Sequence, residues 1–224
     1  MKANSQFRTL AAPAILSVIL QFATIPIQST SAGTVSSVQG NIVYANDANV
    51  VMQLTNNGKD TDPELSPDGK QIVFVRDTPG IQADTPQGRL DVDELWLIGA
   101  DGSNAHRVLR GHADDEPRRS VAGIGSPSFS PDGRVVYFMS AGWVTSSGIH
   151  AIGVDGGALH FVTDGNSLEV IRSGKYRGYL IVNKHDYNDQ GAYDAFWLVS
   201  PSGQKIQNIG ENDVDVSSFK SRNN

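Results

Sequence analysis

The sequence predicts an all-β fold, a small β-propeller with four blades of four antiparallel strands each. Two observations lead to this prediction: a pair of turn motifs recurs in the same order along the chain, and strand-like apolar runs separate the turns. The composition agrees, because 23 glycines and 10 prolines among 224 residues favour frequent turns and short strands over long helices. A β-sandwich is the alternative, but it does not predict two turns recurring in one fixed order.

The first recurring motif is a Ser-Pro-Asp-Gly turn, found at 66–69 and again at 130–133, with an altered third copy ending at Gly178. Proline presets φ for the first central residue of the turn, and glycine accepts the left-handed conformation at its end. Such a turn joins two antiparallel strands in a tight hairpin. The apolar runs that follow the three copies are 71–75, 135–138 and 179–182.

The second motif is an apolar strand that ends in Asp-Gly or Ser-Gly, and it follows each copy of the first. One more strand comes after its glycine. Each unit is therefore strand A, tight turn, strand B, longer loop, strand C, tight turn and strand D. The second motif spans 95–102, 149–156 and 196–203, and the last strands of the units end near Leu109, Val162 and Ile209.

The two ends of the repeat predict a fourth, composite blade. Residues 41–46 and 50–55 resemble strands C and D of a blade that lacks its start, and residues 213–219 resemble a strand A without its continuation. Pairing of this last strand with the first ones would close the ring and remove exposed strand edges. Residues 33–224, shared among four blades, give 48 residues per blade, close to the roughly 40–50 of propeller repeats.

The run 62–70, Asp-Pro-Glu-Leu-Ser-Pro-Asp-Gly-Lys, resembles the TolB-type propeller repeat, and so does the run 101–109. The resemblance covers residues 41 to about 219 and implies the propeller fold. Tricorn-like and prolyl-peptidase propellers and some polysaccharide lyases have similar repeats. The sequence departs from the family in two ways. It has no room for the separate α/β domain that precedes the TolB propeller, and it has fewer repeats than the TolB ring.

Residues 1–32 have the order of a secretory signal peptide: Lys2 and Arg8, then a nearly apolar stretch over 10–20, then small residues. An uncleaved membrane anchor is the alternative, but the apolar stretch is short and interrupted, which weakens a span that needs roughly 20 apolar residues. We therefore expect a signal peptide at 1–32, a propeller domain at 33–224 and no membrane span after cleavage. The absence of cysteine favours a periplasmic location, with an extracellular one as the alternative.

The composition also excludes several functions. Without cysteine there is no disulfide framework, thiolate metal site or cysteine nucleophile. A formal charge of -6 argues against nucleic acid as a partner, because phosphate contacts need clustered Lys and Arg. The sequence contains neither a Gly-x-Ser-x-Gly elbow nor a His-x-x-x-His pair or calcium-loop spacing. We therefore assign no catalytic residue, and expect no cofactor and no metal.

Strand order places the tight A–B and C–D turns at one end of the blades and the longer B–C and D–A connections at the other. Long connections on a rigid scaffold are where binding functions concentrate. We therefore expect a polar, partly aromatic binding site at this loop-bearing end, with a solvated acidic rim as the alternative. The candidate residues are His112, Asp114, Asp115, Arg118, Arg119, Trp143, His185, Asp186, Tyr187 and Asp189.

These observations predict a non-catalytic binding module, a monomer that holds an envelope protein or peptide, or a small polar ligand, at its loop-bearing end. The alternative is a small propeller enzyme, a lyase or hydrolase acting on an acidic or sugar substrate. It rests on the carboxylates and histidines of the same end, which could perform acid–base chemistry. A third interpretation is a shortened propeller that folds only as an oligomer.

Overall fold

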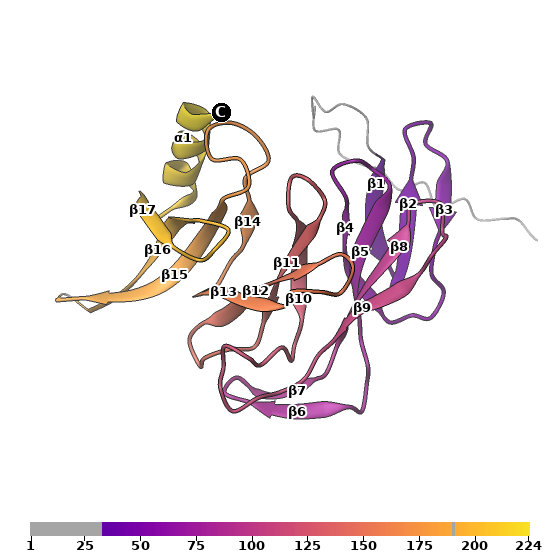
Figure 1. The fold of residues 1–224 in the computed structure, drawn as a ribbon, viewed down its shortest axis with the longest axis horizontal. Coiled ribbons are helices and arrows are strands. Elements are labelled where there is room, and N and C mark those ends of the chain that lie inside the picture. Colours follow the sequence, from indigo (N-terminus) through magenta and orange to yellow (C-terminus); the bar gives the residue numbers. More distant parts are fainter. Residues whose placement is uncertain (1–32, 190) are drawn as a thin grey trace, which may run out of the picture. The chain divides into compact units, whose positions relative to one another are not determined.

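The computed structural model describes residues 33–189 and 191–224, which form antiparallel sheets and one helix (Figure 1). The N-terminal sheet contains β1 (Thr34–Val38), β2 (Asn41–Ala45) and β3 (Val51–Gln53). The first blade contains β4 (Asp60–Leu65), β5 (Gln71–Arg76), β8 (Glu94–Gly99) and β9 (His106–Arg110). A separate hairpin, β6 (Gln82–Thr85) and β7 (Gly88–Asp91), is inserted between β5 and β8.

Two further blades follow. The second blade contains β10 (Gly125–Phe129), β11 (Val135–Ser140), β12 (Ser147–Gly153) and β13 (His160–Gly165). The third contains β14 (Glu169–Val170), β15 (Leu180–Asn188), β16 (Gly191–Val199) and β17 (Lys205–Gly210), and helix α1 (Asp213–Asn223) comes last. The strands of each blade lie in chain order, which confirms the predicted all-β fold of four-stranded antiparallel units. Within the described ranges, no helix has the length and apolar character needed to cross a membrane.

The predicted Ser-Pro-Asp-Gly turns form the A–B connections of the first two blades. In the first, the Gly69 N–H donates to the Ser66 carbonyl at 2.9 Å, and the Ser66 hydroxyl donates to Asp68 at 2.7 Å. The turn at Ser130 has the same two bonds, at 2.9 and 2.6 Å. Gly69 and Gly133 have φ of 72° and 71°, a conformation that glycine adopts without strain. The turn chemistry is local, which is why the sequence alone predicts it.

Each blade buries alternate residues against the elements on its two sides. In β5, Ile72 and Phe74 pack with the N-terminal sheet, whereas Val73 and Val75 pack with the second blade. This alternation is the two-residue period of a strand buried on both faces. It continues into the third blade, where Leu180 packs back against the second blade.

Residues 213–219 form part of helix α1, so the predicted strand and the composite blade are wrong. The Asn212 side chain caps the helix by accepting from the N–H groups of Val214 (3.0 Å) and Asp215 (3.1 Å). The alternation of valines in this segment suggested a strand, but Val216 and Phe219 are three residues apart and are buried on one helix face. In the described residues the N-terminal sheet consists of β1, β2 and β3 alone, with β1 as a strand that the sequence analysis did not predict.

Helix α1 covers the face of the third blade that corresponds to a blade-to-blade contact. Three pairs of directly opposed residues mark this face in successive blades: Val73 with Leu97, Tyr137 with Ala151, and Ile181 with Leu198. The first two pairs pack against the following blade. Ile181 and Leu198 pack instead with Val216 and Phe219 of α1. The helix therefore takes the place of a following blade, as a terminal cap does in other repeat proteins.

Candidate functional site

Three connections at the loop-bearing end are tied together by hydrogen bonds. They are the hairpin β6–β7, the connection from β9 to β10 and the connection from β11 to β12. The Gln87 side-chain amide, on the hairpin, donates to the carbonyls of Trp143 (3.0 Å) and Ser146 (3.2 Å). The Ala141 N–H donates to the Ala122 carbonyl at 2.8 Å. These bonds join segments of two blades into one continuous surface.

Phe161 on β13 brings two of the predicted site residues together. The Trp143 ring packs edge-on against Phe161 with centroids 5.9 Å apart, and the Arg118 guanidinium lies 5.6 Å from the Phe161 centroid. Next to Trp143, Val144 is 77% exposed. The His150 ring packs edge-on against Phe161, with centroids 5.6 Å apart. Sequence reasoning missed Phe161 because it lies in an ordinary strand D and no motif distinguishes it.

The other predicted residues of the β9–β10 connection lie beside this surface. Asp114 Oδ1 accepts the Glu116 N–H at 2.9 Å and a hydrogen bond from Arg119 at 3.1 Å. The Glu116 N–H is the main cause of the lowered pKa of Asp114. Asp114 and Arg119 therefore shape the connection by binding each other, whereas His112 and Asp115 are exposed.

The predicted residues at 185–189 form a second group on the third blade. The sequence analysis placed these residues in a long connection at the loop-bearing end, but β15 and β16 continue there as a long hairpin. His185 Nδ1 lies 2.9 Å from Asp194 Oδ1, and the exposed Tyr187 ring packs edge-on against His185. Asp186 is paired with Lys205 at 3.0 Å, a hydrogen bond that lowers the pKa of Asp186.

The two groups belong to different blades. Among the described residues, no hydrogen bond or ring contact links His185, Asp186, Tyr187 or Asp189 directly to Arg118 or Trp143. Asn166 connects segments next to the two groups: its side chain donates to the Thr145 carbonyl at 3.1 Å, and its N–H donates to the Asn183 carbonyl at 2.7 Å. The predicted site is therefore divided into an aromatic surface and a separate hairpin.

A buried carboxyl group, Asp93, lies just before β8 and only 9% of it is exposed. Burial raises the pKa of Asp93 to about 6, and the neighbouring Asp77 and Asp91 carboxylates add to the effect. Burial also raises the pKa of Asp77. In the part of the chain that the structure describes, no group of three His, Asp or Glu side chains is arranged to hold a metal ion.

Replacing Asp93 by asparagine is expected to raise the free energy of unfolding at pH 7 by about 2–3 kcal/mol. The ionised carboxylate lowers the stability of the folded protein, because its pKa is near 6 in the folded protein and near 3.8 in the unfolded chain. This cost disappears as pH falls from about 6 to 4, so the difference between the variant and the parent should vanish near pH 4. Urea unfolding at both pH values measures it.

His150 has the opposite effect on stability as the pH falls from about 6 to 4, because burial lowers its pKa to about 4. The unfolded chain binds a proton at this histidine below about pH 6.5, and the folded protein does not, so stability falls as pH decreases. Comparing variant with parent removes this shared contribution. Asp189→Asn, on the exposed hairpin, is the control. An equal gain from that control would contradict the account of Asp93.

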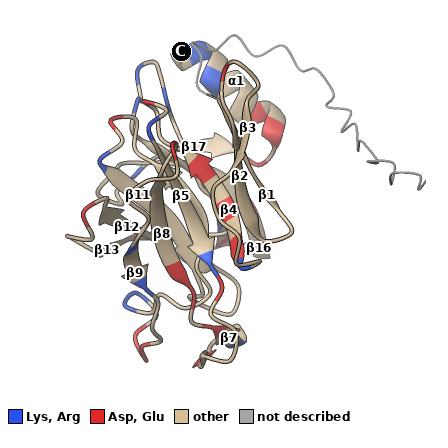
Figure 2. Ribbon diagram, turned by 90° about the vertical axis from the view of Figure 1, so that its right-hand side faces the viewer, with Lys and Arg blue, Asp and Glu red and all other residues tan. Residues whose placement is uncertain are grey.

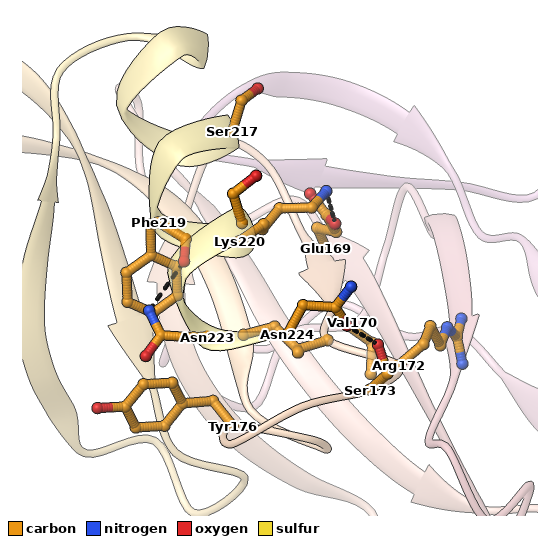
Figure 3. Close-up of a pocket in the computed structure, with 12 residues that line it drawn as sticks. Glu169, Val170, Arg172, Ser173, Tyr176, Ser217, Phe219, Lys220, Asn223 and Asn224 are labelled. Atoms are coloured by element: carbon orange, nitrogen blue, oxygen red, sulfur yellow. Dashed lines mark hydrogen bonds and ion pairs between the residues drawn. The ribbon is translucent and has the colours of Figure 1, made fainter.

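A pocket of about 470 Å³ lies between α1 and the residues around β14 (Figure 3). Residues 169–173 line one side of it, and Ser217 and Lys220 of α1 line the other. Lys220 is ion-paired with Glu169 across the pocket at 2.5 Å. The sequence analysis missed this pocket because it placed residues 213–219 in a strand.

Comparison with solved structures finds similar folds in several larger proteins. Dipeptidyl peptidase 4 from Porphyromonas gingivalis matches with a TM-score of 0.53 at 12% identity, over 82% of this chain and 32% of that one. The β-propeller domain of the Trilobed protease from Pyrococcus furiosus matches with a TM-score of 0.47 at 16% identity, over 77% and 49%. TolB from Acinetobacter baumannii matches with a TM-score of 0.38 at 12% identity, over 78% and 50%.

This chain thus spans half or less of the length of each of these proteins. No protein-family model matches the chain, and no curated protein matches it by sequence. At these identities the likeness concerns the fold alone. The repeated four-stranded antiparallel sheets and the structural match together show that this chain has a β-propeller fold.

Proposed function

We propose that this protein is a non-catalytic binding module of the periplasm, which holds an envelope protein or peptide at its loop-bearing end. The contact surface, here called the loop surface, consists of Gln87, Arg118, Trp143, Val144 and Phe161. The observation that carries the proposal is the packing of Trp143 and Arg118 on Phe161 beside the exposed Val144.

This combination of side chains suits a protein or peptide partner. Tryptophan and arginine are enriched among the residues that contribute most to binding energy, particularly where they are held rigidly. Phe161 orients both, and the Gln87 amide fixes the backbone at Trp143. A surface organised before binding loses less conformational freedom when the partner arrives.

Several polar candidates are already ion-paired with other side chains. Their carboxylates therefore shape the surface and are less available for acid–base catalysis. Asp114 is bound to Arg119, and Asp186 to Lys205. The His185–Asp194 pair favours the enzyme alternative, since a histidine oriented by a carboxylate can act as a general base. This pair lies on the hairpin of the third blade and not on the loop surface.

Two matched variants test the binding proposal. Val144→Glu introduces a charge on the loop surface, and Val214→Glu introduces the same charge on α1, where the side chain is 74% exposed. We expect Val144→Glu to reduce crosslinking to identified envelope proteins by about tenfold or more, and Val214→Glu to leave it unchanged. Circular dichroism verifies folding. Equal crosslinking by both variants would reject the loop surface as the binding site.

The enzyme alternative has a different signature. It requires turnover of an acidic or sugar substrate that His185→Gln abolishes and Val144→Glu preserves.

Export is tested separately: we propose that residues 1–32, which lie outside the described residues, are a cleaved signal. N-terminal sequencing of exported protein should begin at Gly33, and a start at Met1 would refute cleavage.

A further inference from the structure

Asn57 and Gly58 lie in the connection from β3 to β4, and they form the sole Asn-Gly pair of the sequence. An asparagine before glycine is chemically labile, because glycine has no side chain to keep its backbone nitrogen away from the asparagine amide. Both residues are exposed. For a methyl group at Gly58 the nearest described atom would be the Gln39 carbonyl oxygen, at 3.8 Å. The Gly58 nitrogen therefore lies in an open, hydrated segment.

Hydrogen bonds hold the Asn57 side chain at both ends. Its oxygen accepts the Lys59 N–H at 2.8 Å, and its nitrogen donates to Asp60 Oδ1 at 3.3 Å. The bond from Lys59 polarises the side-chain carbonyl and draws electrons from Cγ, the atom that a nucleophile attacks. A donor in this position also stabilises the negative charge that develops on the oxygen during attack. The Lys59 N–H therefore activates the Asn57 amide.

Asp60, the other partner of Asn57, is a buried carboxylate where the N-terminal sheet meets the first blade. It begins β4, is 0% exposed and is paired with Arg76 at 2.6 Å. Its carbonyl accepts the Ser37 hydroxyl at 2.6 Å, and its N–H donates to the Gly40 carbonyl at 2.8 Å. The strands β1, β2 and β3 have no charged residue, whereas β4 has acidic residues, red in Figure 2. A buried carboxylate depends on its hydrogen-bond donors, and Asn57 supplies one of them.

We propose that Asn57 is a site of spontaneous deamidation, and that its products loosen the N-terminal sheet from the first blade. The Gly58 nitrogen loses its proton to hydroxide and bonds to Asn57 Cγ. The Cγ–Nδ2 bond then breaks, and the nitrogen takes a proton from water and leaves as ammonia. Water opens the resulting succinimide at either carbonyl, which gives aspartate or isoaspartate. The net reaction consumes water and releases ammonia without oxidation or reduction, and it is independent of the function proposed for the loop surface.

Both products disturb the contacts around Asp60. The donor that faced Asp60 Oδ1 becomes a carboxylate, so repulsion between like charges replaces a hydrogen bond to a buried charge. The neighbouring Lys59 is exposed, and water screens its charge. Isoaspartate also lengthens the backbone by a methylene group beside a close contact, because a methyl group at Gly40 would lie 2.3 Å from the Gly58 carbonyl carbon. The junction therefore weakens once Asn57 has reacted.

Peptide mass mapping of the full chain, incubated at mildly alkaline pH, tests the reaction. We expect the mass increase that replacement of NH2 by OH produces to appear first at Asn57, at a rate that rises with pH because the Gly58 nitrogen must lose its proton. Asn57→Gln keeps an amide but forms a cyclic imide far more slowly, and should suppress the change. Deamidation that appears first at another asparagine would overturn the assignment. An Asn57 that stays intact in the folded chain, while a free peptide of residues 54–60 reacts completely, would do the same.

Two neighbouring variants test the effect on the fold. Asn57→Asp and Asn56→Asp make the same charge change at exposed positions, but within the described residues only Asn57 bonds to Asp60. We expect Asn57→Asp to speed hydrogen exchange of the Asp60 amide, which is bonded to Gly40, at least about fivefold. Asn56→Asp should leave that exchange unchanged, and neither variant should affect the third blade. Equal acceleration by both variants, or none by Asn57→Asp, would overturn the proposed loosening.

The aged protein itself provides the last test. Anion-exchange chromatography separates the deamidated chain, which carries an additional negative charge, from the parent. Its Asp60 amide should exchange at least as fast as that of Asn57→Asp, because the isoaspartate form adds the displaced backbone to the charge. Exchange equal to that of the parent would show that the reaction leaves the junction intact, and would overturn the proposed loosening.

Discussion

Replacing Phe219 by alanine is expected to lower the free energy of unfolding by about 3–5 kcal/mol, the range for a large buried aromatic side chain. Phe219 is 3% exposed, stacks on Tyr176 with centroids 5.6 Å apart, and packs with Ile181 and Leu198. Urea unfolding followed by circular dichroism measures the loss. Val214→Ala is the control on the same helix, because Val214 is 74% exposed and should change stability by about 0.5 kcal/mol or less.

The large effect follows from how α1 is held in place. Its sequence is rich in Asp, Ser, Val and Asn, which are weaker helix formers than Ala, Leu or Lys. Its stability must therefore come from packing, and Val216 and Phe219 are its two buried residues. Loss of one anchor should release the helix and expose the face of the third blade. A cost below about 1 kcal/mol would mean that α1 does not act as the cap.

Replacing Gly203 by alanine is expected to cost about 2–4 kcal/mol, the second large effect. Gly102, Gly156 and Gly203 occupy the C–D turns of successive blades, with φ of 83°, 83° and 88°. An alanine at any of them carries about 1 kcal/mol of backbone strain. At Gly203 the new methyl group also collides with the Val162 carbonyl, and such overpacking adds about 1–3 kcal/mol.

The other two glycines are matched controls for this collision. At Gly156 a methyl group would lie 3.2 Å from the Val108 carbonyl, and at Gly102 it would lie 3.7 Å from the flexible Leu54 side chain. The loss of stability should therefore be smallest for Gly102→Ala, larger for Gly156→Ala and largest for Gly203→Ala. Each contact joins a turn to the last strand of the preceding sheet, or to the residue just after it in the case of Leu54, so the series tests how closely neighbouring sheets pack. Equal costs at all three positions would contradict the described contacts.

The sequence alone predicts those parts of the fold that local chemistry determines. The Ser66 and Ser130 turns form the same hydrogen bonds, because each needs only its own residues. The altered third repeat still forms strands, since β15 and β16 keep the apolar pattern. The C-terminal helix was missed because its alternating valines also suit a strand. The Asn212 cap, a local signal of a helix start, was available in the sequence.

Prediction of the candidate site is less complete, because a site depends on contacts between distant segments. Arg118 and Trp143 were predicted at the same end of the blades, and Phe161 connects them, although no local pattern identifies Phe161. His185 and its neighbours were expected on the same surface, but the hairpin of the third blade carries them separately. The pocket between α1 and the residues around β14 depends on a helix docked against a sheet, which neither segment reveals by itself.

Hydrogen exchange of the chain ending at Glu211, compared with the full chain, tests the central claim most directly. If α1 takes the place of a following blade, its removal should speed exchange in β15, β16 and β17, whose outer face it covers. The first blade, β4, β5, β8 and β9, should be unchanged, because its contacts do not involve α1. Unchanged exchange in the third blade, or equal acceleration in the first and third blades, would contradict the claim.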